Sequence, residues 1–230
     1  MAAEPLAYEG TGYEVVEQEP PEILGRNLIS ASYLLAGATA FFFIAFVFAY
    51  FYLRSLNNAG MWKPQGVDAS VGWGTAIVAC YVLSAVLVRL GLSDHRALRR
   101  DRWRLKGLAA LLIGVVGLVL QVLDWTHESF GPADGGFASV YFGWTAFLFL
   151  FVFITLIWLE MTLAMSYRYR GYVAASREVP AGHASGDPGR MAHDIRDPLS
   201  LVRAELMGLS FYWTFLAAVA VVSWIILYLI

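Results

Sequence analysis

Five long apolar stretches separate shorter polar segments along this chain. They cover residues 28–53, 71–92, 105–125, 139–165 and 206–230. About 20 apolar residues in a helix cross the roughly 30 Å hydrocarbon core of a bilayer, and each stretch is at least that long. Because lipid offers the backbone no hydrogen-bond partner, such segments cross as helices. The pattern predicts an all-α, integral membrane bundle of five transmembrane helices.

Two polar segments are expected to lie outside this bundle. Residues 1–27 contain six glutamates and three prolines but no apolar core, which predicts an acidic, extended cytoplasmic tail and no cleaved signal. Residues 171–198 are rich in turn-forming residues and predict a mobile cytoplasmic loop. The rest of residues 28–230 forms a single membrane domain.

The composition agrees with a membrane location. Hydrophobic residues make up 59% of the 230, and charged residues only 15%, against about 25% in soluble domains. This excludes an ordinary soluble protein, and we expect no nucleic-acid partner. The one cysteine, Cys80, lies in an apolar stretch and is expected to be a small buried side chain.

Basic residues are distributed unequally between the two sides of the predicted bundle. Arg54 and Lys63 follow the first stretch, whereas the other fourteen Lys and Arg residues belong to the opposite side. The positive-inside rule places that richer side, and with it the N-terminus, in the cytoplasm. Five spans then place the C-terminus outside. In the third stretch, Gly107, Gly114 and Gly117 predict close approach of neighbouring helices.

The segment "QVLDWTHESFGPADGG" places Asp124, His127 and Glu128 within five residues at the end of the third stretch. These side chains suit a metal site, a proton relay, or the polar end of a membrane helix. No second ligand cluster is visible, and Gly131–Pro132 interrupts the segment at once, so the pattern favours a solvated, hydrogen-bonded helix end. None of the four histidines lies in a predicted span, which argues against haem held within the bilayer by histidine pairs.

Glu160, in the fourth stretch, is the ionisable residue that we expect inside the membrane. It could snorkel, pair with a neighbouring helix through Arg89, or belong to a proton path. The sequence contains no phosphate-binding glycine loop, HExxH motif or nucleophile elbow. We therefore predict no catalytic, cofactor-binding or metal-binding residues on this chain alone.

Several segments, taken in order, resemble subunit III of the haem–copper cytochrome c oxidases, in the short bacterial form with five helices. They are "FAYFYLR" (48–54), "MWKP" (61–64), "QVLDW" (121–125), "FYWTF" (211–215) and "VSWIILYLI" (222–230). The resemblance covers about residues 24–230. Three family features differ: the fourth stretch lacks the signature histidines, Ala38–Thr39 replaces a Ser–Glu pair, and Thr214 replaces a histidine.

The resemblance implies an accessory subunit of a respiratory terminal oxidase, which oxidises cytochrome c and reduces O2. Such a subunit has no redox centre, packs against subunit I in a complex that includes subunit II, and leaves haem and copper to those partners. It holds anionic phospholipid, stabilises the complex in a bacterial cytoplasmic (inner) membrane, and can join a larger respiratory supercomplex.

The candidate lipid-binding or subunit-interface residues under this resemblance are Arg89, Gln121, Asp124, Trp125, Glu160, Tyr212 and Trp213. Two alternatives remain open. The first is the third subunit of a quinol oxidase or nitric oxide reductase. The second is a small membrane transporter with Glu160 as its coupling residue.

Overall fold

The computed structural model describes residues 21–57, 60–97, 99–168 and 198–230, and within these ranges it contains helices and no strand. The helices are α1 (Pro21–Ser55), α2 (Val71–Arg96), α3 (Arg100–His127), α4 (Gly136–Arg168) and α7 (Pro198–Trp224), and α7 continues into a π-helical turn, η2 (Ile225–Leu229). Five helices in this part of the chain are long and apolar enough to cross a membrane. The predicted all-helical membrane bundle is confirmed.

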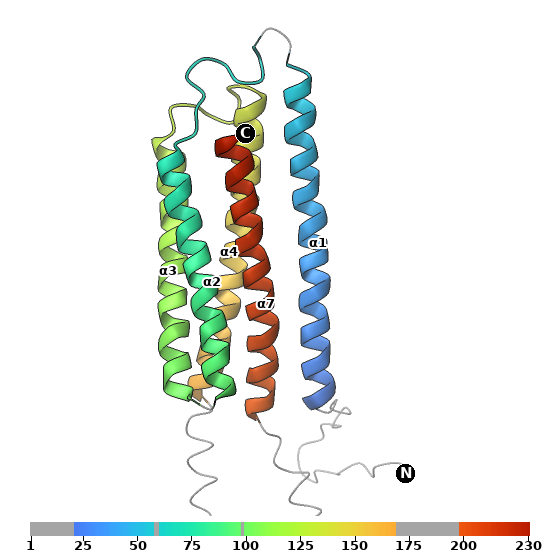
Figure 1. The fold of residues 1–230 in the computed structure, drawn as a ribbon, viewed down its shortest axis with the longest axis vertical. Coiled ribbons are helices and arrows are strands. Elements are labelled where there is room, and N and C mark those ends of the chain that lie inside the picture. Colours follow the sequence, from blue (N-terminus) through green and yellow to red (C-terminus); the bar gives the residue numbers. More distant parts are fainter. Residues whose placement is uncertain (1–20, 58–59, 98, 169–197) are drawn as a thin grey trace, which may run out of the picture.

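The helices lie side by side along one axis (Figure 1). α2 and α3 form an antiparallel hairpin, α7 packs on both α2 and α1, and α4 contacts α3, α7 and α1. α1 begins at the end opposite Ile230, as an odd number of spans requires. We call the end that carries Ile230 the upper end, as it is drawn in Figure 1, and the opposite end the lower end.

Several helices extend beyond the predicted spans. α1 begins at Pro21, within the predicted 1–27 tail, because proline suits the first helical turn, where its missing N–H would have no partner. α2 continues to Arg96, beyond the end of the predicted span 71–92, and so includes His95. Residues 1–20 of the predicted tail and 171–197 of the predicted loop lie outside the described residues.

The core is built around large aromatic side chains with polar atoms. The largest fully buried ones are Trp103, Trp144, Trp213, Tyr81, Tyr141 and Tyr212. Of these, all but Tyr81 hydrogen-bond to another helix, for example Trp144 Nε1 to Ser223 Oγ at 2.7 Å. A buried indole or phenol needs such a partner. These bonds therefore select which helices lie next to one another.

Glycines of α3 allow its neighbours to approach closely, as the sequence predicts. An added Cβ at Gly107 or Gly114 would lie 2.7 or 2.5 Å from a side-chain carbon of α4. At Gly117 it would lie 2.6 Å from the ring of Tyr81 on α2. These glycines therefore let α3 pack closely against both α4 and α2.

We expect Gly117→Ala to lower the melting temperature of the protein in detergent. The new methyl would overlap the Tyr81 ring, which is only 1% exposed and has little room to move. Overpacking of this kind typically costs about 1–3 kcal/mol. Gly37→Ala on α1 is the matched control, since nothing lies within 4 Å of its added Cβ. Equal melting temperatures for the two variants would show that the α2–α3 approach is looser than described.

Candidate functional site

The connection between α1 and α2 closes the upper end over the start of α4. The N–H groups of Gly136 and Phe137 donate to the carbonyl oxygens of Met61 and Trp62 at 3.2 and 2.8 Å. The first N–H groups of a helix have no partner within the helix, so these loop carbonyls take that place. The "MWKP" segment is therefore the cap of α4.

A buried polar network lies just beneath this cap. Asp124 of α3 is 1% exposed, and its Oδ2 accepts hydrogen bonds from Tyr141 OH at 2.5 Å and Gln121 Nε2 at 3.1 Å. Tyr141 OH has a single proton, which goes to Asp124, so Tyr228 OH donates to Tyr141 across 3.1 Å. A chain of hydrogen bonds thus runs from Tyr228 of η2 through Tyr141 of α4 to the carboxyl group of Asp124 on α3.

α2 also takes part, through a glycine. An added Cβ at Gly74 would lie 2.7 Å from Cε2 of Tyr228. The Tyr228 ring therefore packs directly against the backbone of α2 at this glycine. Beside the network, Trp125 Nε1 donates to Thr145 Oγ1 at 3.0 Å and ties α3 to α4. The sequence predicted a solvated, hydrogen-bonded helix end here. The hydrogen bonding is present, but Asp124 is buried because three other helical elements cover it.

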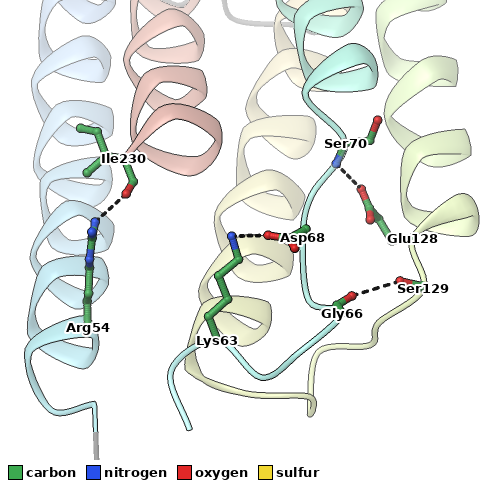
Figure 2. Close-up of polar contacts among 8 residues, drawn as sticks. All are labelled: Arg54, Lys63, Gly66, Asp68, Ser70, Glu128, Ser129 and Ile230. Atoms are coloured by element: carbon green, nitrogen blue, oxygen red, sulfur yellow. Dashed lines mark hydrogen bonds and ion pairs between the residues drawn. The ribbon is translucent and has the colours of Figure 1, made fainter. Parts of the chain in front are cut away.

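Charged groups surround the network at the surface of the upper end. Arg54 donates to the carbonyl oxygen of Ile230 at 2.8 Å, and Lys63 pairs with Asp68 at 2.6 Å (Figure 2). Both basic residues line a cavity of about 520 Å³ between the ends of α1, α4 and η2. Each cation is thus already engaged by a partner of this chain.

Arg89 lies in a different place, toward the lower end of a groove between α2 and α7. The groove has a volume of about 240 Å³ and almost wholly apolar walls. Its lining residues are Val82, Ala85, Val86, Arg89, Thr214, Ala217, Ala218 and Val221. The exposed guanidinium therefore stands at the edge of a surface otherwise suited to a hydrocarbon chain.

Glu160 is exposed on α4, between the exposed apolar side chains of Ile157 and Met161. It does not pair with Arg89, which lies on α2. A coupling residue of a transporter would need to face an internal path, whereas Glu160 faces away from the bundle.

Tyr212 and Trp213, predicted as lipid or interface candidates, are buried and bond within this chain. Tyr212 OH lies 3.0 Å from Thr39 Oγ1 of α1, and Trp213 Nε1 donates to Ser84 Oγ of α2 at 3.1 Å. α7 is thereby fixed to α1 and to α2. Contact of either residue with lipid or another subunit stays a prediction.

Sequence reasoning missed several polar residues that the fold brings together. Glu205, in the membrane-spanning part of α7, is half-buried and accepts a bond from Thr162 Oγ1 at 3.4 Å, so Glu160 is not the only intramembrane carboxyl group. At the lower end Arg104 is buried and bonds to Ser166 Oγ at 3.0 Å. In the sequence, Glu205 comes directly before the predicted fifth span, 206–230. That position is the one signal from which a carboxyl group within the membrane could have been predicted there.

The described residues show no arrangement suited to a metal ion. Across residues 21–57, 60–97, 99–168 and 198–230, no three His, Cys, Asp or Glu side chains gather into a possible site. His127 is exposed and stacks on Trp73 with 5.3 Å between ring centroids. His95 is buried with its ring 5.9 Å from that of Trp103.

We expect Tyr141→Phe to destabilise the chain more than Tyr212→Phe does. Both variants delete one buried phenol oxygen, but Tyr141 bonds to the carboxyl group of Asp124 whereas Tyr212 bonds to the neutral Thr39. Bonds to charged groups contribute about 1.5–3 kcal/mol and neutral ones about 0.5–1.5 kcal/mol. Thermal unfolding in detergent measures the difference. A larger loss for Tyr212→Phe would contradict the central place of Asp124.

Comparison with known proteins places the chain in a family. Residues 27–176, which include all of α2, α3 and α4 and most of α1, match the family model for cytochrome c oxidase subunit III. The chain is 28% identical over 135 residues to cytochrome c oxidase subunit 3 of Yarrowia lipolytica, covering 56% of this chain and 50% of that protein. It is 26% identical over 142 residues to the same subunit of Wickerhamomyces canadensis, covering 59% and 53%.

The chain thus spans about half the length of the curated relatives it matches. The family match covers the "MWKP" cap, the Gln121–Asp124–Trp125 helix end and the aromatic fourth helix together. With five helices in its described part that are long and apolar enough to cross a membrane, this multi-pass membrane protein belongs to the cytochrome c oxidase subunit III family.

Proposed function

We propose that this chain is the third subunit of a respiratory haem–copper oxidase that oxidises cytochrome c and reduces O2. The observation that carries the proposal is the family match over residues 27–176. In this role the chain packs against subunit I, in a complex that also contains subunit II. Haem and copper are assigned to those partners, as the family resemblance implies. The two described histidines lie at opposite ends of the bundle, His95 near the end of α2 and His127 at the end of α3.

The contribution of the chain to such a complex is structural. Several of its buried polar side chains bond to other helices of the same chain, as Asp124 and Trp213 do. Rigid packing of this kind suits a subunit that stabilises its partners during turnover without itself transferring electrons.

The charge distribution supports an orientation. Arg54 and Lys63 lie at the upper end, while the other described Lys and Arg residues lie at or toward the lower end. By the positive-inside rule the lower end faces the cytoplasm and Ile230 the opposite side. The proposed location is the bacterial cytoplasmic membrane.

The groove between α2 and α7 supports a role in lipid binding. Its apolar walls fit one acyl chain, and Arg89 at its lower edge offers a cation to an anionic phospholipid head group. A basic residue near the surface of an anionic leaflet contributes about 1 kcal/mol of attraction. The occupant that we propose is therefore one anionic phospholipid of the lower leaflet.

Extraction of the tagged chain in mild detergent tests the oxidase assignment. We expect haem a, two larger subunits and cytochrome c oxidation in the purified material, measured by absorption spectroscopy and O2 consumption. Haem b or o with quinol oxidation would move the chain to a quinol oxidase, and haem b with nitric oxide reduction to a nitric oxide reductase. A colourless chain that purifies alone and carries a solute into liposomes would overturn the oxidase assignment in favour of a transporter.

Native mass spectrometry of the purified complex counts its bound lipids and so tests whether the groove between α2 and α7 binds an anionic phospholipid. We expect Arg89→Ala to lower the anionic phospholipid retained, because the head group loses its cation, and Ala218→Phe to lower it by filling the groove. Arg102→Ala is the matched control, since Arg102 is exposed near the lower end but does not line the groove. Unchanged lipid in both groove variants would remove the groove as a lipid site.

A further inference from the structure

One oxygen of the buried Asp124 carboxyl group has no donor. Both donors that reach this group, Tyr141 OH and Gln121 Nε2, bond to Oδ2. Oδ1 is buried and has no hydrogen-bond partner. A buried carboxyl oxygen without a partner is costly, because it has lost water and gained nothing in exchange.

Glu128, one helical turn beyond Asp124, is placed to fill this position. The backbone N–H of Glu128 donates to the carbonyl oxygen of Asp124 at 3.1 Å, and the two carboxyl groups lie close enough to interact electrostatically. Glu128 is half-buried, and its Oε1 accepts the N–H of Ser70 at 3.1 Å, just before α2 begins (Figure 2). Two ionised carboxylates cannot hydrogen-bond to each other, since neither has a donor. If one of the two groups binds a proton, its O–H can donate a hydrogen bond to the other, and the repulsion between two negative charges is removed.

We propose that Asp124 and Glu128 form a proton-binding site in which Glu128 carries the proton and donates it to Oδ1 of Asp124. The partners of each group fix this assignment. Asp124 already accepts two hydrogen bonds, which favour its anion, whereas the bond from Ser70 occupies Oε1 of Glu128 and leaves Oε2 to carry the proton.

The surrounding groups agree with a proton held at Glu128. Burial and the neighbouring Asp124 charge raise the pKa of Glu128 above its ordinary value, although the Ser70 N–H opposes this in part. The nearest described cation on the α1–α2 connection, Lys63, is paired with Asp68.

Three further titratable side chains lie near the pair, one on α4, one on η2 and one on α3 itself. Tyr141 on α4 and Tyr228 on η2 act as donors in the network described above. His127 on α3 is exposed, and its Nδ1 faces the carbonyl oxygen of Leu123 at 2.7 Å.

The proton makes the upper end sensitive to pH. Because the pKa of Glu128 is raised by folding, its stabilising effect is complete below the ordinary glutamate value of about 4.5 and is lost as the pH rises through the raised value. The protonated Glu128 links Ser70 to Asp124, so its loss loosens the corner between α2 and α3. The site depends on this chain's fold alone and would stand if the oxidase assignment failed.

The test compares Glu128→Gln with the unmodified full chain in detergent. The glutamine amide keeps an acceptor for Ser70 and a permanent donor for Asp124, so it imitates the protonated acid. We expect the melting temperature of the unmodified chain to fall from acidic to alkaline pH, and that of the variant to change much less. The infrared spectrum of the unmodified chain should also contain a carboxylic-acid C=O band that the variant lacks. Asp68→Asn is the matched control and should retain both behaviours, because Asp68 is an exposed carboxylate at the same end.

An unchanged carboxylic-acid band in Glu128→Gln, or an unchanged pH dependence, would overturn the proposal. Should that variant fail to fold, Asp124→Asn supplies the second test. Removal of the Asp124 charge should move the loss of the acid band to lower pH, because the neighbouring anion no longer opposes ionisation of Glu128. A midpoint that does not move would likewise overturn the proposal.

Discussion

A polar atom on the membrane-buried part of this bundle can find a hydrogen-bond partner only within the protein, because lipid supplies none. That constraint, which holds for any chain that crosses a membrane, governs how these helices are placed. Trp144 bonds to Ser223 and Trp213 to Ser84, so each indole selects one small hydroxyl residue on another helix. Hydrophobicity brings the helices into the membrane, and these few pairs determine which faces meet.

The two ends of the bundle satisfy the constraint with opposite charges. At the lower end the Arg104 guanidinium bonds to the side chain and the carbonyl of Ser166 near the C-terminus of α4, where the helix dipole favours a cation. At the upper end Asp124 and Glu128 stand at the C-terminus of α3, where the dipole disfavours an anion. Donated hydrogen bonds to Asp124 offset that penalty, and a proton on Glu128 removes a second negative charge from the same place.

The spans and the close-packing glycines could be predicted because both are local properties of the sequence. Apolar runs of sufficient length and the spacing of Gly107, Gly114 and Gly117 need no knowledge of the partner helix. The same holds for the polar helix end at Asp124. Its partner Tyr141 could not be predicted, since it lies 17 residues away on another helix and Tyr228 lies a further 87 beyond it. Only the packing of α4 and η2 against α3 brings those phenols to the carboxyl group, and no spacing rule encodes it.

At Thr39, in the middle of α1, a neutral hydrogen bond takes the place of a charged group. Thr39 occupies the place where the family resemblance leads us to expect a glutamate, and its hydroxyl bonds to the neutral phenol of Tyr212. The buried carboxyl chemistry of the described residues lies instead near helix ends, with Asp124 in the last turn of α3 and Glu205 toward the start of α7. A neutral bond at mid-span needs no counter-ion and no proton, whereas a carboxyl group near an end can exchange its proton with water. Asp124 and Glu205 are therefore each placed to respond to the nearer side of the membrane, Asp124 at the upper end and Glu205 at the lower end, whereas the Thr39–Tyr212 contact between them serves packing.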